Sequence, residues 1–144
     1  MNDASLETQL RLLGLELESW KKLHNFITYA LDKTKPIISA DQERQFTEIR
    51  GVLLQETEYV FNELKLVAEL SGKALNVLQR AVSLRAVRDL ACEETRRLES
   101  DWNFVFTKLG LLQGQLKARR KELMERRTWA DSLAHLFGRR AAAR

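Results

Sequence analysis

The sequence contains very few of the residues that break helices or cross-link chains. Its 144 residues include one proline, six glycines and one cysteine. Turn-rich β architectures need many more glycines and prolines, so their scarcity argues against sheets. The single cysteine, Cys92, has no second cysteine with which to form an intramolecular disulfide. An oxidising compartment is therefore not indicated.

Long uncharged hydrophobic stretches are also missing. No window of about eighteen residues is apolar and free of charge, so the sequence predicts no transmembrane helix. The beginning, MNDASLETQL, is polar and acidic and does not resemble a signal peptide. Hydrophobic residues make up 44% of the chain and charged residues 31%, which suits a single folded helical domain. We therefore expect a cytoplasmic, folded protein.

The residues that dominate the chain are good helix formers: Leu, Glu, Arg, Lys, Ala and Gln. Over residues 5–33, apolar side chains recur at alternating steps of four and three, starting from Leu6 and ending at Leu31. This spacing places them in one seam of a helix, as in coiled coils and helical bundles. Pro36 then prevents the helix from continuing much past Thr34.

A second seam predicts a helix of similar length over residues 40–70. Ser39 and Gln42 have the spacing of a capping box at its start, and Ser71 followed by Gly72 is expected to end it. Two helices of equal length joined by a short link form an antiparallel hairpin.

The next segment, residues 73–127, allows two interpretations. The same rhythm continues through it, and it contains no proline, so it can be one long helix that needs a partner chain. Alternatively, Ser100 and Asp101 cap a new helix, giving helices over 73–99 and 101–127 that close a four-helix bundle. The second interpretation is preferred. The predicted fold is thus an all-α, elongated antiparallel helical bundle whose last two helices are separate or fused.

The C-terminal residues are expected to form a short amphipathic helix. Thr128 and Asp131 have capping-box spacing, which predicts a new helix over 129–137, ended by Gly138. The chain then divides into a bundle over 1–128 and a helix with a basic tail over 129–144. The apolar side of this helix either folds back to close the end of the bundle, which is preferred, or docks on a partner groove or a membrane surface.

No arrangement of residues resembles an enzyme active site, a cofactor site or a metal site. His24 lies in the apolar seam of the first helix, where a core histidine with one hydrogen bond is expected. A bundle di-metal site needs a Glu three residues before each of its His ligands. That position is occupied by Lys21 before His24 and by Ser132 before His135. Glu56 falls on the second seam and is expected at a boundary position, since burying it unpaired would be costly.

The charge is unevenly placed along the chain. Residues 1–70 hold 8 Lys or Arg against 12 Asp or Glu, whereas residues 71–144 hold 16 against 8. Such asymmetry is typical of proteins with anionic partners, although basic residues also complement a helix C-terminus. The candidate binding residues are the basic and apolar side chains near the C-terminus: Lys117, Arg119, Arg120, Lys121, Arg126, Arg127, Trp129, Leu133, Leu136 and Phe137.

Two functions follow from this pattern. The first is a non-enzymatic interaction module, an adaptor, scaffold or structural subunit, that binds another protein or a second copy of itself. The alternative is a peripheral module that binds an anionic surface, either membrane headgroups or nucleic acid, through its basic C-terminal segment. Neither function requires a small-molecule substrate.

Overall fold

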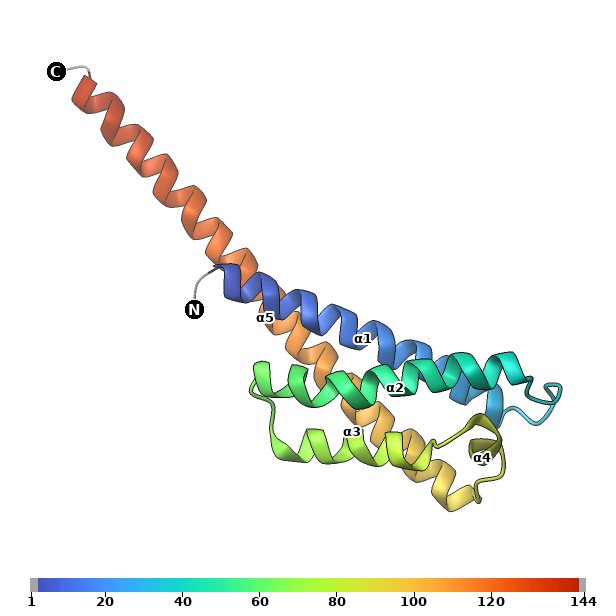
Figure 1. Cartoon of the computed structure of the whole chain (residues 1–144). Coiled ribbons are helices and arrows are strands. Elements are labelled where there is room, and N and C mark those ends of the chain that lie inside the picture. Colours follow the sequence, from blue (N-terminus) through green and yellow to red (C-terminus); the bar gives the residue numbers. More distant parts are fainter. Residues whose placement is uncertain (1–2, 143–144) are drawn as a thin grey trace.

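The computed structural model describes residues 3–142, which form five helices and no strand. Helices account for 87% of the described chain, so the all-α prediction is confirmed. The first four helices and the beginning of the fifth pack together, and the rest of the fifth helix extends away from them (Figure 1). Within the described residues, no helix is long and apolar enough to cross a membrane.

The first two helices form the expected hairpin. Helix α1 spans Asp3–Leu31 and helix α2 spans Ala40–Glu63. The predicted capping box is present, because the Gln42 amide donates to the Ser39 hydroxyl and the Ser39 amide donates to the Gln42 side chain. These two bonds satisfy donors that the helix itself leaves unpaired.

Helix α2 ends earlier than its seam predicts. The Leu66 amide donates to the Phe61 carbonyl and the Lys65 amide to the Asn62 carbonyl, with Lys65 in the left-handed region at φ 55°. This is the Schellman ending, in which glycine usually occupies the left-handed position. The predicted helix over 40–70 is therefore wrong at its C-terminal end. Because the left-handed position is occupied by a lysine and not by a glycine, the sequence carries no signal for the end of this helix.

Two shorter helices follow, and neither interpretation of residues 73–127 is correct. Helix α3 spans Ala68–Arg80, with Ser71 and Gly72 inside it, and helix α4 spans Leu84–Arg88. The break falls between them because the Ser83 hydroxyl accepts a hydrogen bond from the Ala86 amide and so caps α4.

Contacts on both sides of this break hold it in place. Leu84 and Val87 are fully buried, and the Arg88 guanidinium donates to the carbonyls of Ala30 at 2.8 Å and Pro36 at 2.9 Å. Arg88 thus caps the C-terminal end of α1. Asp101, expected to cap a new helix, instead pairs with positively charged side chains of α3.

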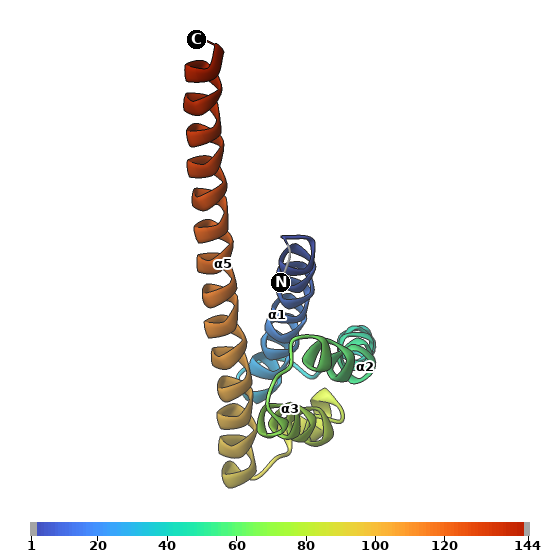
Figure 2. The ribbon, with the colours of Figure 1, turned by 90° about the vertical axis from the view of Figure 1, so that its left-hand side faces the viewer.

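Helix α5 spans Cys92–Ala142, 51 residues or about 76 Å. Its first half packs on α1 and α3 through five buried side chains: Leu98, Trp102, Val105, Leu109 and Leu116. Its C-terminal part extends alone beyond the N-terminal end of α1, as the orange-to-red segment in Figure 2 shows.

The separate C-terminal helix predicted over 129–137 does not exist, because α5 runs through it without a break. The Thr128 hydroxyl donates to the Met124 carbonyl at 3.0 Å, one turn back in the same helix, and does not cap a new one. Gly138 also lies inside α5.

Candidate interaction surface on the last helix

All ten candidate binding residues lie on α5, from Lys117 to Phe137. Only Arg120 among them is partly buried, and its guanidinium lies 3.6 Å from the Glu7 carboxylate at the start of α1. Arg126 pairs with Glu122, one turn back along α5, at 2.7 Å. The structure therefore assigns two of the predicted basic residues to ion pairs within the chain.

The basic residues of this segment do not form a single stripe. At about 100° per residue, Arg119 and Arg126 share one side of the helix, whereas Lys117 and Lys121 lie on another. Positive charge therefore surrounds the segment on several sides. A phosphate-rich partner would therefore meet positive charge on more than one side of this helix.

The apolar side chains of the tail, in contrast, share one side of α5. Trp129 is 69% exposed, Leu133 40%, Leu136 58% and Phe137 64%. We call these four residues the tail face. The preferred expectation that they fold back onto the end of the bundle is wrong, because the continuous helix carries them away from it (Figures 1 and 2).

The tail face is not a continuation of the side of α5 that packs on the bundle. The packed side follows Leu109, Leu116 and the partly buried Leu123. At about 100° per residue, the centre of the tail face is rotated from it by roughly 110°. A helix that covered the packed side along the whole of α5 would therefore leave the tail face exposed.

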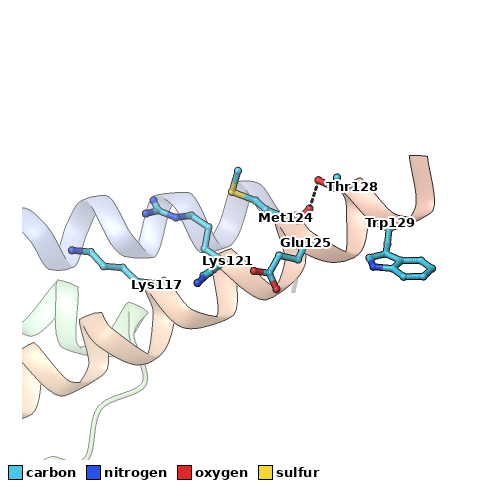
Figure 3. A pocket seen from close by; sticks show the side chains of 7 residues that line it. Lys117, Lys121, Met124, Glu125, Thr128 and Trp129 are labelled. Atoms are coloured by element: carbon cyan, nitrogen blue, oxygen red, sulfur yellow. Dashed lines mark hydrogen bonds between the residues drawn. The ribbon is translucent and has the colours of Figure 1, made fainter. Parts of the chain in front are cut away.

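A shallow surface depression lies next to Trp129. All the residues that line it come from α5, and the Trp129 indole projects away from the helix (Figure 3). Met124, in the same region, is 61% exposed. No second element forms an opposite wall among the lining residues, so this region can contact a partner but does not enclose a small molecule.

A different concave surface lies between α2 and α3. Its floor includes the buried Leu53 and Leu78, and its rims carry Leu54, 41% exposed, and Leu75, 47% exposed. We call it the α2–α3 groove; its volume is about 460 Å³. No sequence pattern predicts this groove, because it exists only where α2 ends at Glu63 and α3 turns back beside it.

A charged side chain outside the predicted seam of the first helix, Glu16, is buried in the core. Glu16 is 3% exposed and accepts hydrogen bonds from the Thr57 hydroxyl at 2.7 Å and the Trp20 indole N–H at 3.0 Å. Burial raises the pKa of Glu16, although both hydrogen bonds act in the opposite direction. Glu56, which the sequence placed on the seam, is exposed, as expected of a boundary residue.

His24 joins α1 to α5. Its Nε2 lies 2.9 Å from the Glu99 carboxylate, and its ring stacks on Trp102 with 3.8 Å between centroids. The Trp102 indole N–H in turn donates to the Trp20 carbonyl at 3.1 Å. The expected single hydrogen bond is present, but the ring lies at the edge of the core, because its side chain is 26% exposed.

No three side chains among His, Cys, Asp and Glu gather as a possible metal site anywhere in residues 3–142. Comparisons of the chain with protein-family models, with curated proteins and with solved structures give no match. The fold itself defines the class: an all-α bundle from which one long helix protrudes.

Proposed function

We propose that this protein is a non-enzymatic, cytoplasmic interaction module, an adaptor, scaffold or structural subunit, that binds a protein partner through the tail face. The observation that supports this proposal is the exposure of four large apolar side chains on one side of a protruding helix. Their spacing, at Trp129, Leu133, Leu136 and Phe137, is that of the anchors by which an amphipathic helix enters an apolar groove.

Exposure of these side chains to water favours binding. Complete burial of one large apolar side chain is worth about 1.5–3 kcal/mol relative to leaving it exposed. Scattered exposed apolar residues are common on protein surfaces, but a contiguous row with two aromatic members is typical of interaction sites. The helix is already formed by its continuity with the packed half of α5, so binding needs little additional ordering.

Site-specific photo-crosslinking in cells tests the proposal. A benzoylphenylalanine at Leu133 samples the tail face, and one at Asp131 samples the opposite side of the same helical turn. We expect a defined protein to be cross-linked at Leu133 and not at Asp131. Absence of a defined adduct, or equal adducts at both positions, would count against a docking role for the tail face.

The alternative function is binding to an anionic surface, and the basic residues that flank the tail face favour it. Anionic vesicles should then shift the fluorescence of the exposed Trp129 to shorter wavelength, since Trp20 and Trp102 are buried already. The shift should weaken with salt. Nucleic acid would give salt-dependent binding without insertion of Trp129. If neither probe binds at low salt, the alternative is refuted.

A further inference from the structure

The tail face and the α2–α3 groove are both apolar, and one is convex whereas the other is concave. The first is a convex helix side with apolar anchors, and the second is an apolar groove with exposed leucines on its rims. Small residues on α3, namely Ala68, Ser71 and Gly72, line the groove. A Cβ atom added at Gly72 would meet no atom within 4 Å, so the groove is open there to an incoming helix.

The charges at the two surfaces are opposite in sign. Glu58, from α2, is the charged side chain among those that line the groove. The tail segment 117–142 has eight basic residues against three acidic ones. Complementary potentials of this kind favour association and set the orientation of the partners.

The tail of one chain cannot reach its own groove. Helix α5 is continuous through Ala142 and points away from α2 and α3 (Figures 1 and 2). An occupant with the right shape and charge is instead available on every other copy of the chain. We propose that the tail face of one chain docks in the α2–α3 groove of a second copy. This inference rests on the proposed function, because it names the partner of the same tail face.

Such a contact joins two different surfaces of the molecule. Reciprocal exchange between two chains closes a dimer, and one-way docking builds longer assemblies. Either arrangement predicts that two chains defective in different surfaces complement each other. Tail-to-tail pairing makes no such prediction, because a defective tail would then prevent association whatever the state of the groove.

Light scattering of the full chain tests whether the chain associates with itself. Over roughly 1 µM to 1 mM, where weak and moderate associations become populated, the molar mass should rise from 16.7 kDa to at least twice that value. Added salt should reduce the association. A molar mass that stays at 16.7 kDa throughout would overturn this inference. The proposed function would survive that result if photo-crosslinking at Leu133 still captures a different, defined protein.

Two variants with matched controls then locate the contact. Leu133→Glu with Leu136→Glu disrupts the tail face, and Ala134→Glu with His135→Glu adds the same charge on the opposite side of α5. Gly72→Arg fills the groove and repels the basic tail, whereas Gly72→Ala leaves it open. Circular dichroism confirms that each variant is folded, which is expected at Gly72 because the added side chain meets open space.

We expect the tail variant and Gly72→Arg each to be monomeric, both controls to associate normally, and an equal mixture of the two defective variants to recover association. If Gly72→Arg associates as tightly as the unmodified chain, the groove is not the docking site and the inference is refuted. Failure of the mixture to associate would refute it as well.

Discussion

The buried Glu16 carboxylate allows a test that separates the cost of its charge from the value of its hydrogen bonds. Its oxygen accepts from Thr57 on α2 and from the fully buried Trp20 on α1. In Glu16→Gln, the side-chain carbonyl still accepts both bonds and the charge is gone. In Glu16→Leu, the acceptor is lost, and a buried donor without a partner costs about 1–3 kcal/mol. We expect Glu16→Leu to lose stability by about that amount through the Trp20 indole alone.

The pH dependence gives the sharper result. Because burial raises the pKa of Glu16, the folded state holds this proton more tightly than the unfolded chain does. The stability that this carboxyl contributes is fully present below its ordinary pKa and is lost as pH rises through its raised, folded-state pKa. Glu16→Gln has no such proton to lose. Its stability relative to the unmodified protein should therefore increase as pH rises through that window and become constant above it.

Urea unfolding followed by circular dichroism, at a series of pH values from acidic to neutral, measures this difference directly. Other carboxyl groups titrate in the same range, but they are shared by both proteins and cancel in the comparison. A difference that does not change with pH would mean that Glu16 is not desolvated in the folded state. A difference that changes in the opposite direction would mean that its hydrogen bonds outweigh its burial.

Three further predictions concern the seam, the tail and the α1 cap. Leu53→Ala, and likewise the seam variant Leu17→Ala, should each cost about 2–5 kcal/mol in urea unfolding; a loss below ~0.5 kcal/mol at both would show that the seams do not form the core. Removal of residues 129–144 should change stability by no more than about 0.5 kcal/mol, because the tail face is exposed; a larger loss would place it against the bundle. Arg88→Ala should destabilise the protein by roughly 1.5–3 kcal/mol, the range for charged hydrogen bonds, because it leaves the Ala30 and Pro36 carbonyls without their donor. Thermal unfolding of Arg88→Ala checks this, with the exposed Arg85→Ala on the same helix as the control.

The sequence predicts the first hairpin well because its signals are local. The seam of α1, the proline after it and the Ser39 capping box all act within a few residues of the boundaries they set. The later boundaries depend on contacts between distant parts of the chain. The end of α2 uses a lysine where glycine is usual, and the break before α4 is held by Arg88, whose carbonyl partners lie more than fifty residues away.

Composition and spacing predict which residues are candidates for binding but not how they are arranged. Capping-box spacing at Thr128 predicts a break, whereas the hydroxyl donates back to the Met124 carbonyl and the helix continues. Spacing alone cannot distinguish these outcomes, since threonine makes both kinds of bond. The α2–α3 groove was beyond prediction for a different reason: it requires the turn at Lys65, which places α3 beside α2.

The packed part of α5 and the tail face can be altered independently of each other. The side of α5 that packs on the bundle and the tail face point in directions roughly 110° apart on one continuous helix. Residues 124–142 of α5, about 28 Å of helix, follow Leu123, which is the last described side chain of α5 that packs on the core. A substitution on the tail face therefore changes no contact in the core. A core substitution such as Leu109→Ala should lower the stability of the bundle without changing the shape of the tail. Binding measured with tail variants consequently reports on the partner contact alone, which makes the tail face the most direct place to test what this protein does.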